Sequence, residues 1–472
     1  MEAGASDAEA GDLFEALFMA DVEDVEPPTR TKEEGRELLA RAVPAEAVAL
    51  HGCVLGPERA IEDAYVVVGA GSEIQAVSEE KPQGVRVLET DGVILPGLID
   101  LHGHPEFNVF AAWEPPQQFV NRYAWRGSDV YRELVREPQN RLLAALPART
   151  QLRYAEVRAL VCGVTAIQGA SGKVKGTEEA LVRNVDLWVF GSQRARAMID
   201  LPSESSRDME RLKGILTGIE AREVKAFYVH LAEGRSDNER SQREFDRLVA
   251  LKALTDATVV IHGTALAPAQ FGDLADAGAK LVWSPQSNLR LYSETTNAAE
   301  AMKRGVLVGL GADWLPSGSA SLLAEMKVAR RSLRTHGHEA PARKLVEMVT
   351  SDAAKIAGLD DKLGSLQEGR PADLVVLERH HSDPWENVVE ADPGWVDLVM
   401  VDGDLAYGRA DWMTTLTDPG DRDHLEPVIA WGQEMLLDTS YMARPTTEEP
   451  PTLAELRAAL IQSYPPVGPI FA

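Results

Sequence analysis

The sequence is poor in cysteine, in aromatic residues and in basic residues. Only two cysteines, Cys53 and Cys162, occur among 472 residues, too few for the disulfide framework of a small secreted protein. We therefore expect both thiols to be buried as small apolar side chains and the protein to work in the reducing cytoplasm.

The charge balance is acidic, with 48 Lys and Arg against 74 Asp and Glu and a net charge of −26. Nucleic acid and anionic lipid both attract basic surfaces, so this balance argues against both as partners. The acidic N-terminus lacks the basic start of a signal peptide, and no apolar run approaches the ~18 residues that cross a bilayer. We expect a small-molecule substrate, no nucleic-acid or membrane partner, and assembly into a homo-oligomer.

Changes of pattern along the chain predict five segments. Residues 1–44 form an acidic arm, which we interpret as a solvated tail; the alternative is a subunit contact through Leu13, Phe14, Leu17 and Phe18. Short β-rich runs broken by turn residues predict a small antiparallel sheet on either side of the middle of the chain. The remaining segments are the first part of a β-sandwich (45–97), a barrel (98–364), the second part of the sandwich (365–412) and a C-terminal extension (413–472).

The middle segment alternates apolar, strand-like runs with stretches that have apolar residues at helical spacing. Such alternation predicts βαβ units and a parallel sheet. Eight units, with the third and fourth strands at 186–191 and 195–202, fit a (β/α)8 TIM barrel. The predicted fold class is therefore α/β, with a barrel beside a small β-sandwich built from both flanking segments.

Polar side chains follow several of these strands at the point where each strand should end. His102 and His104 follow the first strand, and their spacing places them on the same side of it. His230, His262 and Asp313 end later apolar runs in the same way. Because the carboxyl ends of barrel strands meet on one face, these side chains should lie together there.

Three imidazoles and a carboxylate suit one divalent metal ion, with zinc preferred and iron, manganese or cobalt as alternatives. Zinc-bound water ionises near pH 7, at a pKa of about 7. Glu233, three residues after His230, is placed to carry protons between that water and a leaving group. His262 would polarise the bond under attack or hold the tetrahedral intermediate.

The motifs HGH after VILPGLIDL, then HLAE, IHG, WSPQSN and GLGAD, in this order, resemble those of the amidohydrolase superfamily. Within it, the sequence over 45–410 is similar to the branch of cytosine- and guanine-type deaminases and triazine hydrolases. The resemblance implies that His102, His104, His230 and Asp313 bind the metal, with Asp313 also serving as a base. It further implies that Glu233 is the proton shuttle and His262 an electrophile beside the metal.

Binuclear members of that superfamily carry a carboxylated lysine at a middle strand end. The corresponding positions here, Gly191 and Leu201-Pro202, offer no lysine, while Lys173 and Lys175 fall in a Gly-rich loop that resembles a surface segment. We therefore expect a single metal ion.

Aromatic residues gather near the predicted strand ends although they make up only 6% of the chain. This gathering predicts a pocket for a flat or apolar group. The candidate substrate-binding residues are the aromatics Phe107, Trp113, Tyr292 and Trp314 and the polar Ser287 and Asn288.

The leading hypothesis is a mononuclear metal-dependent hydrolase that cleaves a non-peptide C–N bond by attack of metal-bound hydroxide. An aromatic pocket favours an amide or urea, as in the phenylurea hydrolases to which the chain is similar. The first alternative is an aminohydrolase that releases ammonia from a heterocycle. The second is a catalytically silent barrel used for binding.

Overall fold

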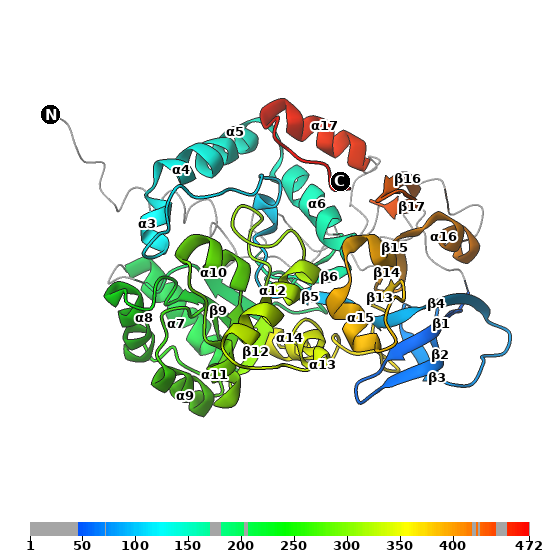
Figure 1. The fold of residues 1–472 in the computed structure, drawn as a ribbon, viewed down its shortest axis with the longest axis horizontal. Coiled ribbons are helices and arrows are strands. Elements are labelled where there is room, and N and C mark those ends of the chain that lie inside the picture. The colour runs from blue at the N-terminus through cyan, green and yellow to red at the C-terminus, as the bar shows by residue number, and fades with distance from the viewer. Residues whose placement is uncertain are drawn as a thin grey trace.

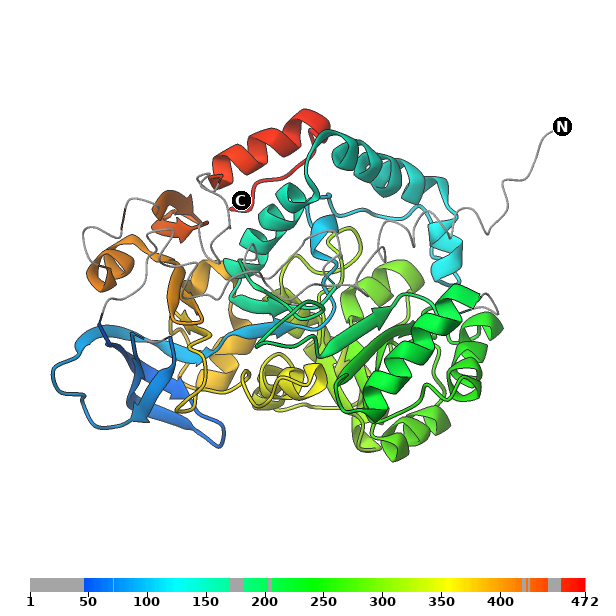
Figure 2. The same cartoon turned by 180° about the vertical axis from the view of Figure 1, so that it is seen from behind.

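The computed structural model describes residues 46–70, 72–169, 181–202, 206–417, 422, 425–439 and 451–471. The predicted arm at 1–44 and the residues Lys173 and Lys175 lie outside this part of the chain. A barrel of strands and helices lies beside a large β-sheet, and a helix near the C-terminus runs along one edge (Figures 1 and 2).

Eight parallel strands form the barrel, as the alternating pattern predicts. Five of them pair in the order β12-β11-β10-β9-β8, and three pair in the order β5-β6-β7. The two groups meet where Leu101 N donates a hydrogen bond to Leu310 O at 3.3 Å. The strands are β5 (Leu98–Asp100), β6 (Val164–Ile167), β7 (Arg183–Asn184), β8 (Ala195–Met198), β9 (Ala226–Leu231), β10 (Thr258–His262), β11 (Lys280–Trp283) and β12 (Leu307–Leu310).

Helices cover the outside of the barrel with their apolar faces inward. In α8, Phe245 and Leu248 are buried, and the Asn238 side chain caps the first turn by accepting a hydrogen bond from Ser241 N. These helices are α6 (Ala148–Leu160), α7 (Ser206–Glu220), α8 (Glu239–Ala250), α9 (Pro268–Ala277), α10 (Pro285–Tyr292), α11 (Ala298–Lys303), α12 (Leu322–Thr335), α13 (Ala342–Glu347) and α14 (Ser351–Ala357).

The third strand does not lie where the pattern predicts it. The prediction of a strand over 186–191 is wrong, because those residues form turns, and β7 covers only two residues upstream. The buried Asp186 carboxylate accepts hydrogen bonds from Gly169 N at 2.5 Å and Gln168 Nε2 at 3.1 Å. This side chain takes up polar groups at the end of β6, so the chain turns there. The fourth strand, β8, lies within the predicted range 195–202.

The two flanking segments, together with β16 and β17 of the C-terminal extension, build one nine-stranded sheet in the order β16-β17-β15-β14-β13-β4-β1-β2-β3. The segments join where β4 pairs with β13, with Leu95 opposite Val375. The prediction of a purely antiparallel arrangement is wrong at one place, because β1 and β4 run parallel. The strands are β1 (Val48–Leu55), β2 (Ala60–Val68), β3 (Ile74–Ser78), β4 (Arg86–Pro96), β13 (Leu374–Leu377), β14 (Val396–Val401), β15 (Asp404–Arg409), β16 (Leu425–Ala430) and β17 (Gln433–Asp438).

The segment between β5 and α6 crosses the mouth of the barrel. It carries η1 (Pro105–Phe107), α3 (Arg122–Arg126), α4 (Asp129–Tyr131), a π-helical turn (Arg132–Arg136) and α5 (Glu137–Ala145). Helix α17 (Leu453–Ser463) packs against α5 and α6 (Figure 1). The remaining helices are α15 (Pro384–Glu390), η3 (Pro393–Trp395) and α16 (Ala410–Leu416).

Both cysteines are free and buried, as predicted, and Cys162 packs within the main hydrophobic cluster. Among the described helices, none combines the length and the hydropathy that a bilayer crossing requires.

Candidate active site

Asp100 joins the first and last barrel strands beneath the site. Its Oδ1 accepts hydrogen bonds from His102 N and Ala312 N, both at 3.1 Å. Asp313 N in turn donates to His102 O at 2.6 Å. Gly311 permits this close approach, because a Cβ atom there would lie 2.6 Å from His102 N. The result is that His102 and Asp313, 211 positions apart in the sequence, meet at the barrel mouth.

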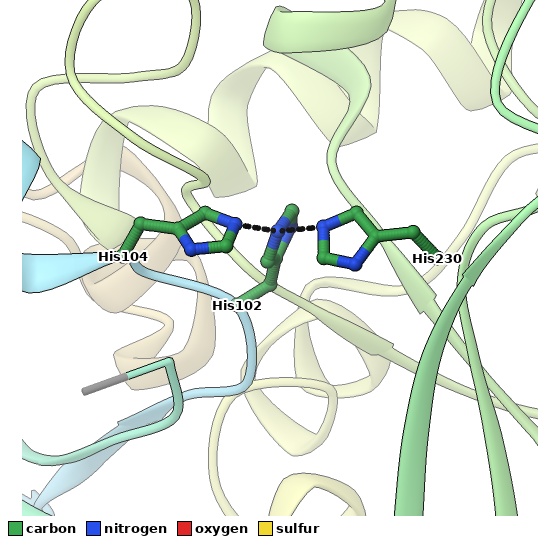
Figure 3. A group of neighbouring side chains, drawn as sticks. All are labelled: His102, His104 and His230. Carbon is green, nitrogen blue, oxygen red and sulfur yellow. Dashed lines mark hydrogen bonds between the residues drawn. The ribbon is translucent and has the colours of Figure 1, made fainter. Parts of the chain in front are cut away.

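Four side chains from three strand ends bring their donor atoms together. His102 Nε2 lies 2.9 Å from His104 Nε2 and 3.1 Å from His230 Nε2 (Figure 3). Asp313 Oδ1 lies 3.5 Å from His102 Nε2 and 4.0 Å from His104 Nε2. A neutral imidazole Nε2 carries either one proton or one lone pair, so protons alone cannot satisfy three converging nitrogen atoms. Such convergence is typical of a cation site.

Burial keeps the three rings neutral. Desolvation lowers the pKa of His102 and His230 well below the usual value, and it lowers the pKa of His104 to about 3 with a smaller contribution from His102. Neutral imidazoles and a carboxylate are the ligands that zinc and similar divalent ions prefer. The donor set therefore fits a divalent metal ion.

His262 and Glu233 lie beside this donor group. His262 Nδ1 is 2.9 Å from Asn288 Oδ1; because an amide oxygen only accepts, Nδ1 carries the ring proton. The other nitrogen, Nε2, lies 3.7 Å from Glu233 Oε2 and 4.0 Å from Asp313 Oδ2. Three groups that can each accept a proton thus surround one small space.

Arg122 fixes the loop that carries Glu233. Its side chain is 2% exposed and pairs with Asp200 at 2.7 Å and Glu244 at 2.8 Å. Its backbone N donates to Glu233 O at 3.2 Å, and Glu244 Oε2 accepts from Ala232 N at 2.7 Å. Burial opposes the charge on Arg122, but the attraction of Glu244 and Asp200 outweighs it and raises the pKa of Arg122 well above its usual value.

Replacing Arg122 with alanine is expected to lower the free energy of unfolding by about 2–4 kcal/mol, because it removes a buried guanidinium, takes the ion pair from Glu244 and leaves Asp200 with Arg126 alone. Denaturant unfolding measures the loss. The matched control is Arg243→Ala, which removes only an exposed pair with Glu239 and should cost less than about 0.5 kcal/mol. Equal, small losses in the two variants would contradict the stabilising role of the buried pair.

A cavity open to solvent lies over the donor group, and its empty space, open solvent included, is about 360 Å³. Its walls are formed by His104, Trp125, Arg126, Ile199, His230, Glu233, His262, Leu291, Asp313 and Trp314. The converging donor group, Glu233 and His262 therefore share one space with an aromatic wall.

The profile of the amidohydrolase family matches residues 93–406 of this chain. That range is more than half of the sequence and includes every residue of the donor group. The chain belongs to the amidohydrolase family.

Three proteins show which amidohydrolases the chain is similar to. The 5-methylthioadenosine/S-adenosylhomocysteine deaminase of Desulforudis audaxviator is 25% identical over 398 residues, which cover 73% of this chain and 92% of the relative. The E. coli guanine deaminase structure aligns with a TM-score of 0.60 and 19% identity, covering 77% of this chain and 100% of the other. The atrazine chlorohydrolase structure from Arthrobacter aurescens TC1, complexed with zinc, aligns with a TM-score of 0.59 and 18% identity, covering 76% and 94%.

These similarities confirm the predicted α/β barrel fold and the predicted branch of deaminases and triazine hydrolases. They also confirm that the chain is an amidohydrolase enzyme acting on C–N bonds other than peptide bonds. A catalytically silent barrel is therefore not the function of this chain. A small-molecule substrate is confirmed as well, and the roles of the individual site residues stay predictions.

Of the predicted aromatic substrate residues, one lines the cavity and two lie behind its wall. Trp314 lines the cavity. Phe107 and Trp113 are buried behind it, with ring centroids 5.8 Å and 5.9 Å from Trp314. They support the wall rather than form its inner surface.

The other predicted substrate residues contact the site from outside the cavity. Ser287 Oγ lies 2.8 Å from Ser317 Oγ, and Asn288 orients His262 as described above. The Tyr292 hydroxyl donates to Glu233 Oε1 at 2.5 Å. All three are fully buried, so their polar atoms are used within the protein.

Three cavity residues were not predicted from the sequence, namely Trp125, Ile199 and Leu291. Trp125 and Arg126 belong to the segment between β5 and α6, which follows no repeat of the barrel pattern. Arg126 Nη1 lies 2.7 Å from Asp200 Oδ2, so its charge is paired. The gathering of aromatics was the only sequence signal that points to Trp125.

Proposed function

We propose that this chain is a zinc-dependent aminohydrolase that releases ammonia from an amino-substituted heteroaromatic ring. The observation that carries the proposal is the position of Glu233 and His262 beside the donor group, in a cavity whose wall includes Trp125 and Trp314. The relative from Desulforudis audaxviator, 92% of whose length is covered, is a 5-methylthioadenosine/S-adenosylhomocysteine deaminase. This similarity supports ammonia release.

In this proposal His102, His104, His230 and Asp313 hold one ion. Their donor atoms already converge, and the residues that line the cavity include no lysine to bridge a second ion. When bound, a divalent ion such as zinc would supply Lewis acidity and bring the pKa of a water ligand close to 7.

The side chains of the protein then handle the proton. Glu233 accepts it from the attacking water at Oε2 and delivers it to the leaving nitrogen. The hydrogen bond between Nδ1 and Asn288 orients the His262 ring, so that Nε2 faces the part of the cavity where the substrate would react. A second proton at Nε2 would let His262 donate to developing negative charge. Burial of the whole cluster strengthens these electrostatic contacts.

Hydrolysis of an amide or urea is the second candidate. The cavity wall away from the catalytic cluster is formed by Trp125, Ile199, Leu291 and Trp314, with Arg126 as its polar residue. This apolar wall would accept an N-aryl group and offers few hydrogen-bonding groups to read a base.

Product analysis separates the two candidates. We expect ammonia from an aminopurine nucleoside such as 5-methylthioadenosine, and no aniline from N,N-dimethyl-N′-phenylurea or an anilide. Free ammonia is measured by a coupled assay, and aniline by chromatography. The metal-free protein, prepared with a chelator, is the control. Aniline release without ammonia from any heterocycle would establish the second candidate and contradict the first.

We also propose that the protein works in a reducing compartment such as the cytoplasm, because Cys53 and Cys162 are both free. Assembly into a homo-oligomer stays a prediction from the sequence.

A further inference from the structure

We propose that Tyr292 is a positioning residue that orients Glu233, and that Trp125 fixes the direction of the Tyr292 hydroxyl proton. This inference rests on the proposed role of Glu233 in proton transfer. It replaces the substrate-binding role that the sequence predicts for Tyr292.

The direction of hydrogen bonding follows from the chemistry of the three groups. An indole N–H only donates, so the Tyr292 oxygen accepts from Trp125 Nε1, at 2.9 Å. Its single proton is then free for Glu233 Oε1, at 2.5 Å. A hydroxyl that accepts from one side and donates to a carboxylate on the other makes a strong, charge-assisted bond.

This bond occupies one carboxylate oxygen of Glu233 and leaves the other free for proton transfer. Oε1 is taken by Tyr292, while Oε2 lies 3.7 Å from His262 Nε2 on the side of the cavity. Tyr292 is fully buried and Glu233 is 3% exposed, so water does not compete strongly for the bond. Burial, with Glu233 close by, raises the pKa of Tyr292 well above its usual value, so the hydroxyl stays a donor at working pH.

The backbone holds the three residues in register. Phe119 N donates to Leu291 O at 2.8 Å, and Arg235 N donates to Val120 O at 2.9 Å. The segment before Trp125 is therefore tied both to the residue before Tyr292 and to the loop after Glu233. A Cβ at Gly234 would lie 2.8 Å from Val120 O, so the two segments could not approach so closely with a larger residue there. The hydrogen-bonded series Trp125–Tyr292–Glu233 is thus flanked by backbone hydrogen bonds that fix the three segments relative to one another.

The expected effect of losing the hydroxyl has a definite sign. A hydrogen bond donated to a carboxylate stabilises the ionised form relative to the protonated form. Without the Tyr292 hydroxyl this stabilisation is lost, so the carboxylate that must accept a proton from water does so only at a higher pH. The acidic limb of the pH dependence of kcat should then move upward.

The test compares Tyr292→Phe with Tyr154→Phe. Tyr154 is also fully buried and donates to Gly468 O at 2.6 Å, and it does not line the cavity. For Tyr292→Phe we expect kcat to fall about tenfold and the acidic limb to move up by about one pH unit, with wild-type metal content. For Tyr154→Phe we expect an unmoved acidic limb.

An unmoved limb in Tyr292→Phe, even with a lower kcat, would overturn the inference, as would equal shifts in both variants. If Tyr292→Phe does not fold, Trp125→Phe takes its place, with an upward shift supporting the inference and an unmoved limb overturning it. A separate variant, Glu233→Gln, tests the proposed function. If that variant is inactive while Tyr292→Phe keeps the wild-type pH profile, only the positioning role fails.

Discussion

Replacing Glu233 with glutamine is expected to lower kcat by a factor of about 10² to 10⁴ while metal content stays at the wild-type level. Glutamine has nearly the same shape, and its amide oxygen can still accept from the Tyr292 hydroxyl. It cannot take up and release a proton at neutral pH. The loss should therefore appear in kcat, with little change in KM if KM reflects substrate binding.

The same substitution at Glu156 is a matched control for Glu233→Gln. Glu156 is 1% exposed and accepts hydrogen bonds from Leu181 N and Asn184 Nδ2, at 2.9 Å and 2.8 Å, away from the cavity. Glu156→Gln should keep a kcat close to the wild-type value. A Glu233→Gln variant that contains metal and turns over substrate at the wild-type rate would exclude Glu233 as the proton carrier.

Replacing His230 with alanine is expected to remove the metal and to lower turnover by at least about 10³-fold. His230 contributes one of three converging ring nitrogens and is held neutral by burial. Alanine removes one of the three converging ring nitrogens and leaves the donor group short of a ligand. Elemental analysis of the purified variant and a turnover assay measure the two effects.

The control for His230→Ala is a histidine from a second His-Gly-His motif, which lies outside the donor group. His336-Gly337-His338 has the same spacing as His102-Gly103-His104, but His336 is exposed at the end of α12. His336→Ala should keep both metal and activity. Full metal content in His230→Ala would show that this ring is not a ligand.

The strand-end pattern was sufficient to predict the fold and the donor group. Each of His102, His230, His262 and Asp313 follows a buried apolar run, and parallel strands bring such ends together whatever their separation in sequence. The residues before each His-Gly-His motif distinguish the two copies. His102-Gly103-His104 follows an apolar strand, whereas His336-Gly337-His338 follows helix α12.

The features that were not predicted depend on packing that a single sequence does not encode locally. An aromatic residue near a strand end can face the cavity, as Trp314 does, or support a catalytic group from behind, as Tyr292 does. Trp125 reaches the site from a segment without barrel periodicity. The third strand is only two residues long, and Asp186 after it binds Gln168 and Gly169, just beyond the preceding strand, an interaction without a periodic signature.

The proposed chemistry depends most directly on the metal. Elemental analysis of the freshly purified protein should find about one divalent ion, zinc, per chain. The count should fall to near zero after chelation, together with turnover, and both should return when zinc is added back. A freshly purified, active protein without a stoichiometric divalent metal would contradict the central claim.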